Sequence, residues 1–235
     1  MTRPTVLLFD IDGTLVTTSG AGRRAIERAF AQRYGRSDML RDVRFGGMTD
    51  RAITRIGLAG LGEPADGPAA ERAIDALLEH YVTVLAEEVA NETGIRLHAG
   101  VLETLDALVD RPHTAIGLGT GNIRPGARLK LGRVGIFERF AFGGFGCDHE
   151  ERTELLRIGA GRGAACLGVP VGACRLVVIG DTPRDVAAAG AIGAESVAVA
   201  TSSYDRAALA ASGARWVFED LTAPDVLATL VPDAA

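Results

Sequence analysis

Lysine is almost absent from this sequence of 235 residues, in which Lys130 is the single lysine among 25 basic residues. Chemistry that needs an ammonium group therefore has one candidate, and arginine must supply most of the positive charge. The formal net charge is -5, so the chain lacks the basic excess with which proteins bind nucleic acid or an anionic membrane surface. We therefore expect a small metabolite as partner, and neither nucleic acid nor a membrane.

Cysteines and long apolar runs are also scarce. Cys147, Cys166 and Cys174 are odd in number and form no CxxC pair, which argues against a disulfide framework and predicts reduced, mostly buried thiols. No apolar run approaches the length of a membrane span, and Met1 to Pro4 lead into the first apolar segment without a signal-peptide pattern. These absences predict a cytoplasmic protein.

Hydrophobic residues make up 47% of the chain, enough for a sizeable core. An apolar run at 6–9 predicts a buried strand, and from residue 95 onward short apolar strands alternate with helices. The later strands are expected at 114–119, 140–143, 175–179, 196–200 and 215–218, and the helices at 100–110, 124–134, 152–166, 205–211 and 223–230. This alternation predicts an α/β fold with a doubly wound, mostly parallel sheet.

Residues 17–94 show only helical patterns. One helix ends near Gly35, Thr49 is a plausible N-cap of a second, and Pro68 opens a third that stops between Asn91 and Gly94. A crossover between neighbouring strands does not need about eighty residues. We therefore expect a core domain of 1–16 and 95–235, interrupted by an all-helical domain of 17–94.

The first expected strand ends in two carboxylates, Asp10 and Asp12, followed by Gly13, which lets the backbone turn away. Two like charges this close need a cation, a shared proton or a reacting group between them. Thr120 and the pair Asp181 and Asp185 follow two other expected strands. Ligands bind at the carboxyl ends of parallel strands, so these groups should share one crevice.

The sequence from Asp10 to Thr14, Asp-x-Asp-Gly-Thr, resembles motif I of the haloacid dehalogenase (HAD) superfamily phosphatases. The constellation suggests that Asp10 attacks phosphorus and forms an aspartyl phosphate, while Asp12 protonates the leaving group and later activates water. Clustered hard oxygen ligands favour Mg²⁺, for which we expect Asp10, Asp181 and the backbone carbonyl of Asp12 as ligands.

The resemblance extends to two further motifs. The segment with Thr120, Gly121 and Asn122 is similar to motif II, which implies that the Thr120 hydroxyl holds the transferring phosphoryl group. The segment from Gly180 to Asp185 is similar to motif IV, which implies that Asp181 binds the metal and Asp185 supports the metal or the motif III cation.

The resemblance is weaker at motif III. The family usually has a lysine shortly before the helix that leads into the motif IV strand. No lysine stands there, and Arg152 is our candidate replacement, since a guanidinium binds phosphate oxygens in bidentate fashion. Lys130 is the rival, but we expect it to be solvent-exposed on its helix. His149 is a third candidate, although a lone histidine among acidic residues is more often a surface residue.

The helical insertion lies between motifs I and II, and in this it resembles the C1-type cap of phosphoglycolate phosphatase and β-phosphoglucomutase relatives. Such a cap closes over a small substrate and excludes water. Thr49 and Arg51, after the Gly46-Gly47 pair, form a candidate specificity loop. Three further insertion arginines, Arg23, Arg24 and Arg44, either contact an anionic substrate or only solvate the domain surface.

The resemblance favours phosphoryl chemistry over carbon–halogen cleavage, because the dehalogenase branch lacks an acid at the position of Asp12. The leading hypothesis is a Mg²⁺-dependent phosphatase acting on a small phosphate monoester, most similar to phosphoglycolate phosphatases. A phosphomutase would use the same aspartates. An alternative from a different class is a non-catalytic phosphate-binding or regulatory module, which would have the same fold without the enzymatic activity. We make no prediction of oligomeric state.

Overall fold

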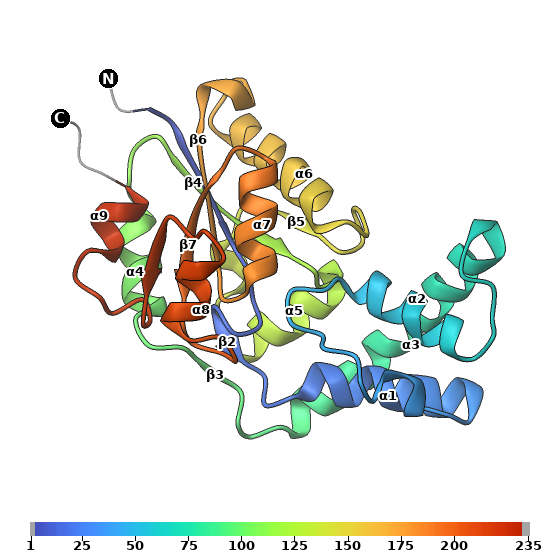
Figure 1. Cartoon of the computed structure of the whole chain (residues 1–235). Helices are drawn as coiled ribbons and strands as arrows, with labels where there is room; N and C mark the ends of the chain where they lie inside the picture. Colours follow the sequence, from blue (N-terminus) through green and yellow to red (C-terminus); the bar gives the residue numbers. More distant parts are fainter. Residues whose placement is uncertain (1–2, 232–235) are drawn as a thin grey trace.

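The computed structural model describes residues 3–231, so positions 1–2 and 232–235 of the predicted core lie outside the described residues. Its centre is a six-stranded sheet in the order β5-β4-β1-β6-β7-β8 (Figure 1), and all of its pairings are parallel. The strands are β1 (Thr5–Phe9), β4 (Thr114–Thr120), β5 (Phe142–Phe145), β6 (Arg175–Gly180), β7 (Glu195–Val199) and β8 (Trp216–Phe218). The predicted α/β class with a doubly wound sheet is confirmed.

Strand β1 is buried along its whole length, because helices cover both faces of the sheet. Val6 and Leu8 pack in one hydrophobic cluster with α6 and α7, whereas Leu7 and Phe9 pack in another with α4, α5 and α9. The helices of the core are α4 (Val101–Leu108), α5 (Arg124–Arg133), α6 (Arg152–Cys166), α7 (Pro183–Ala191), α8 (Arg206–Ala211) and α9 (Val226–Leu230).

The helical insertion contains α1 (Ala21–Tyr34), α2 (Asp50–Gly60) and α3 (Gly67–Asn91), which lie together beside the sheet in Figure 1. These helices share a hydrophobic cluster of their own, separate from the two clusters that cover the sheet. The short strands β2 (Val16–Thr17) and β3 (Arg96–Leu97) pair antiparallel, one at each end of the insertion. We therefore retain 17–94 as the proposed cap domain.

Several details differ from the sequence expectations, among them the start of α9, which lies at Val226 and not at residue 223. Strand β5 begins two residues late, at Phe142, because a 3-10 turn over Phe137–Arg139 precedes it. Helix α7 was not predicted, since its alanine-rich sequence has no clear apolar stripe. Of the cysteines expected to be mostly buried, only Cys174 is buried, whereas Cys147 and Cys166 are exposed.

Within residues 3–231, no helix combines the length and the apolar character that crossing a membrane requires.

Candidate active site

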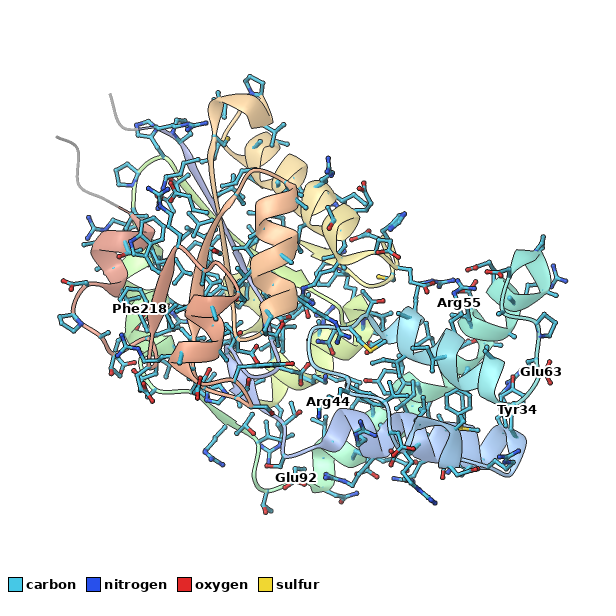
Figure 2. All side chains as sticks on the ribbon, in the orientation of Figure 1. Tyr34, Arg44, Arg55, Glu63, Glu92 and Phe218 are labelled. Atoms are coloured by element: carbon cyan, nitrogen blue, oxygen red, sulfur yellow. The ribbon has the colours of Figure 1, made fainter. Side chains whose placement is uncertain are left out.

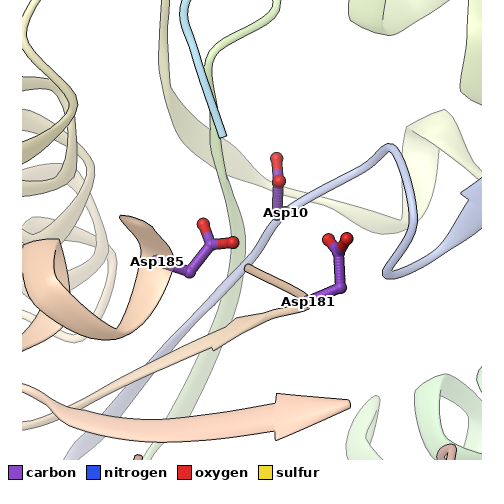
Figure 3. Close-up of side chains that lie close together, drawn as sticks. All are labelled: Asp10, Asp181 and Asp185. Atoms are coloured by element: carbon purple, nitrogen blue, oxygen red, sulfur yellow. The ribbon is translucent and has the colours of Figure 1, made fainter. Parts of the chain in front are cut away.

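The carboxyl ends of the central strands bring together the acidic residues that the sequence singled out. Asp10 follows β1, and Asp181 follows β6, the strand beside it. The carboxylates of Asp10, Asp181 and Asp185 each offer an oxygen, and these oxygens lie within 4.8 Å of one another (Figure 3). All three side chains are buried, with 5%, 3% and 2% of their residue surface exposed. The predicted crevice therefore holds a buried acidic cluster.

Asp181 is held by the motif I turn. The Thr14 hydroxyl donates a hydrogen bond of 2.9 Å to Asp181 Oδ1. Gly13 has φ +81°, and a Cβ at this position would overlap the Asp181 carboxylate. Only glycine satisfies both constraints. Burial, with the nearby charges of Asp185 and Asp10, raises the pKa of Asp181 well above its ordinary value.

Asp185 belongs to the N-terminus of α7. Its Oδ2 accepts hydrogen bonds from the backbone N–H and the hydroxyl of Thr182, at 3.0 and 2.7 Å, and Thr182 caps the helix in return. Its other oxygen forms an ion pair with Arg152. Both oxygens of Asp185 therefore have partners within the protein.

Arg152 is the first residue of α6, and its side chain is buried. Its Nη2 lies 3.0 Å from Asp10 Oδ2. Burial raises the pKa of Asp10 to about 6, although the positive charge of Arg152 opposes this shift. The structure thus places Arg152 beside the predicted nucleophile, where the motif III cation was expected.

The acidic cluster fits a hard divalent cation. Three buried carboxylates face one guanidinium. Burial, reinforced by the charges of neighbouring aspartates, raises the pKa of Asp10 and of Asp181, which shows that the single cation does not fully compensate these buried carboxylates. Mg²⁺ prefers carboxylate oxygens and shields the repulsion between carboxylates and phosphate. Asp10 and Asp181 would hold the ion, and Asp185, with both oxygens engaged, would support them.

The side chain of Asp12 points away from this cluster toward motif II and α5. Its Oδ1 accepts from the Thr18 hydroxyl at 3.0 Å, and its Oδ2 accepts from Asn122 Nδ2 at 2.8 Å and from Lys130 Nζ at 2.7 Å. Burial acts to raise the pKa of Asp12, but the charge of Lys130 and these hydrogen bonds outweigh burial and lower it. Asp12 is thus next to the acidic cluster, with separate partners.

Lys130 is buried, with 4% of its surface exposed, so the expected exposure was wrong. Its ammonium also donates to Asn122 Oδ1 at 2.6 Å. The buried face of α5 carries Gly126 and Ala127, four and three residues before Lys130. Residues three and four positions apart lie on the same face of a helix, so this spacing could have indicated from the sequence that Lys130 is buried.

Thr120, at the end of β4, is fully buried and accepts a hydrogen bond of 2.9 Å from Asn122 Nδ2. Gly121 and Asn122 line a cavity of about 200 Å³ that also contains Asp10, Asp12 and Arg152. The structure therefore brings Gly121 and Arg152 to the predicted nucleophile, whereas Thr120 lies behind the cavity lining and contacts it through Asn122. His149 lies outside the lining of this cavity, and its Nδ1 accepts from the backbone of Glu151.

The proposed cap closes the cavity from the other side. Thr49 caps α2, and its hydroxyl donates to the backbone oxygen of Glu150 in the core at 2.9 Å. Arg51 pairs with Glu71 and Asp75 of α3. Neither Thr49 nor Arg51 lines the cavity, so the structure does not bring the predicted specificity pair into it. Sequence reasoning missed the residue between them, Asp50, which lines the cavity.

Arg23, Arg24 and Arg44, the further insertion arginines named in the sequence analysis, differ in their surroundings. Arg23 lines the cavity, and its guanidinium lies 3.8 Å from the centre of the Phe45 ring. Arg24 pairs with Glu88 on α3 and with Glu92, the residue that follows this helix. Arg44, labelled in Figure 2, is exposed on the loop before α2. Of these three, only Arg23 lines the cavity, and its guanidinium donates to Glu27 and to the backbone oxygens of Leu40 and Val43.

The parallel sheet and the buried acidic cluster at its carboxyl edge define an α/β protein with a candidate metal-binding active site. A model of the haloacid dehalogenase-like hydrolases matches residues 4–193. The chain therefore belongs to the haloacid dehalogenase-like hydrolase family, and the expectation that it is an enzyme of this superfamily is confirmed.

Solved structures share the fold over almost the whole chain. A hydrolase from Pseudomonas syringae is 22% identical with a TM-score of 0.68, covering 92% of this chain and 94% of that one. A predicted phosphoglycolate phosphatase from Haemophilus somnus is 20% identical with a TM-score of 0.68, covering 97% and 99%. CbbY from Rhodobacter sphaeroides, in complex with phosphate, is 18% identical with a TM-score of 0.66, covering 95% and 96%. A comparison with curated proteins found no match.

Proposed function

We propose that this protein is a cytoplasmic, Mg²⁺-dependent phosphatase that hydrolyses a small phosphate monoester, similar in activity to phosphoglycolate phosphatases. The observation that carries the proposal is the meeting of Asp10, Arg152 and Asp181 at one sheet edge, with Asp12 beside them. Family membership and the likeness to solved phosphatase folds support it. The small cavity favours a metabolite over a drug-sized ligand.

In the proposed reaction, a carboxylate oxygen of Asp10 attacks phosphorus while the ester P–O bond breaks. The electron pair goes to the leaving oxygen, which takes a proton from the Asp12 carboxyl group and departs as an alcohol. Because Lys130 and the hydrogen bonds around it lower the pKa of Asp12 in the unliganded site, a monoanionic ester would bring this proton and give it to Asp12 on binding. Water then attacks the aspartyl phosphate and gives a proton to Asp12, which releases inorganic phosphate and restores Asp10.

The surrounding residues bind and orient the phosphoryl group. Arg152 would pair with its equatorial oxygens, and the Thr120 hydroxyl, Gly121 and Asn122 would hold it from the motif II side. Bound Mg²⁺ would supply charge neutralisation between the carboxylates and the phosphate. The proposed cap would exclude water during transfer.

Liberated phosphate tests the proposal directly. We expect the purified protein with Mg²⁺ to release inorganic phosphate from p-nitrophenyl phosphate and from members of a panel of small phosphate esters. Asp10→Asn should lower turnover by about 10³-fold or more, since the amide cannot act as nucleophile, while circular dichroism shows an unchanged fold. Wild-type rates in this variant would remove Asp10 as nucleophile.

The same assay separates the alternatives. A phosphomutase uses the same aspartates but returns the phosphoryl group to a second hydroxyl of the sugar, so it would interconvert sugar phosphates with little free phosphate. Failure to release or transfer phosphate from every ester tested would favour a non-catalytic phosphate-binding module.

A further inference from the structure

Asp50 connects the proposed cap to the motif II segment through two hydrogen bonds. It is the first residue of α2 and is 9% exposed. Its backbone N–H donates to the carbonyl oxygen of Gly121 at 2.9 Å. Its carboxylate Oδ2 accepts from the backbone N–H of Ile123 at 2.8 Å. One cap residue thus binds the core on both sides of Asn122.

Asn122 connects these contacts to the chemical groups of the site. Its side-chain amide donates to Asp12 Oδ2 at 2.8 Å and to the Thr120 hydroxyl at 2.9 Å, and its Oδ1 accepts from Lys130. The position of Asn122 therefore affects both the proposed proton-transfer group and the proposed phosphate ligand. Asp50 fixes the backbone on either side of this residue.

Packing of the cap against Gly121 and Ile123, the residues on either side of Asn122, also fixes the position of Asn122. A Cβ on Gly121 would overlap the carbonyl oxygen of Met48, so the cap loop lies directly on this glycine. Ile123 belongs to the core domain in sequence, yet its side chain is buried in the hydrophobic cluster of the cap helices. The motif II segment is therefore clamped by cap atoms when the two domains are docked.

We propose that Asp50 is a positioning residue that couples docking of the cap to the order of the phosphate-binding segment Thr120–Asn122. Docking places the Asp50 carboxylate on the Ile123 amide, which fixes Asn122 and, through it, Asp12 and Thr120. Phosphate binding to this segment favours the docked cap in turn, because coupling between two events is reciprocal. This inference rests on the proposed function, since it assumes that phosphate binds at motif II.

The test measures the binding of inorganic phosphate, with Mg²⁺ present, by calorimetry, and the turnover of p-nitrophenyl phosphate. Asp50→Ala should weaken phosphate binding about tenfold, the usual consequence of losing a hydrogen bond to a charged group. Asp50→Asn keeps an acceptor oxygen for the Ile123 amide and should stay within about threefold of wild type. Equal losses in the two variants would contradict a role through this hydrogen bond.

Two control variants distinguish the specific loss of the Asp50 contact from a general weakening of the cap or of its docking. Asp75→Ala removes an exposed cap carboxylate that pairs only with Arg51, and it should bind phosphate like wild type. Arg55→Ala removes a different cap–core contact, the ion pair of Arg55 (Figure 2) with Glu150, together with the contacts of Arg55 to Glu71 and Ala65 inside the cap, without touching motif II. Its loss of phosphate affinity should be smaller than that of Asp50→Ala. Equal losses would show that any weakening of cap docking has this effect, which would overturn the specific role of Asp50.

Amide hydrogen exchange tests the coupling in the wild-type protein, so it does not depend on whether the Asp50 variants fold. Phosphate should slow exchange of the Ile123 amide and of the peptide that contains α2. Slower exchange at neither site, with phosphate bound, would overturn the coupling. Absence of turnover in a wild-type protein that still shows this protection would overturn the proposed phosphatase and leave the coupling standing.

Discussion

At the residue scale, the site contains two buried cations, Arg152 and Lys130, where the family usually has a motif III lysine. Arg152 is paired with Asp10 and Asp185, on the side of the acidic cluster. Lys130 is paired with Asp12 and Asn122, on the side of motif II. A planar guanidinium suits bidentate contact with phosphate oxygens, whereas an ammonium acts as a point charge. We therefore propose that Arg152 binds phosphate and that Lys130 orients Asp12.

This assignment predicts different kinetic consequences for the two cations. Arg152→Ala should raise the inhibition constant for inorganic phosphate by roughly 10-fold to 100-fold, because a hydrogen-bonded charge is lost. Lys130→Ala should raise it less and should mainly lower kcat, since Asp12 loses a partner. Arg128→Ala, which removes an exposed arginine from the same helix as Lys130, is the control. The reverse order of inhibition constants would transfer the motif III role to Lys130.

At the element scale, the N-terminus of α7 both starts a helix and holds a carboxylate of the acidic cluster. Thr182 and Asp185 form a reciprocal capping box, which satisfies backbone donors of the first turn. The same hydrogen bonds fix the Asp185 carboxylate beside Arg152. A helix cap is therefore also part of the proposed metal site.

Removal of this cap should affect stability and metal binding together. Thr182→Ala should lower the free energy of unfolding by about 1 kcal/mol, measured by denaturant titration, and should weaken Mg²⁺ binding because Asp185 loses its hydroxyl donor. Asp205 caps α8 by accepting from the backbone N–H of Ala208 at 2.8 Å, outside the acidic cluster. Asp205→Ala should cost similar stability and leave Mg²⁺ affinity unchanged. Unchanged Mg²⁺ affinity in Thr182→Ala would contradict the double role.

At the scale of the whole molecule, buried carboxylates oppose folding in the absence of a cation. The pKa of Asp10 is about 6 in the folded protein, against an ordinary value of 3.8. Between these values the folded state binds more protons than the unfolded state, so this contribution to stability is present at low pH and is lost as pH rises through about 6. Metal binding would offset the loss, because the ion replaces the proton.

Mg²⁺ should therefore stabilise the protein more at pH 7.5 than at pH 5, where protons compete for Asp10. A Mg²⁺ concentration of 100 times Kd stabilises a folded protein by about 2.7 kcal/mol. The measurement is the rise in Tm on replacing EDTA with MgCl₂ at each pH, with NaCl of matched ionic strength as control. Asp181→Asn should reduce the rise. Equal rises at both pH values would contradict a metal site that includes Asp10.

Local signals in the sequence were sufficient for much of the fold and for the acidic cluster. The apolar run of β1, the Thr49 cap of α2 and the bounds of α6 follow from propensities and hydrogen bonds that act over a few residues. The order of parallel strands then carries the polar residues at their ends to one edge. Asp10 and Asp181 could therefore be placed together from sequence alone.

Only the tertiary structure decided how the proposed cap meets the core. Asp50 contacts Ile123 across 73 positions of sequence, and Thr49 contacts Glu150 across 101. The same docking turns Arg51 toward α3 instead of the cavity. Such contacts depend on the packing of two separate hydrophobic clusters against each other. Helical periodicity shows which face of a helix is apolar, but the charged partner that a buried side chain meets is set by the domain packed against it.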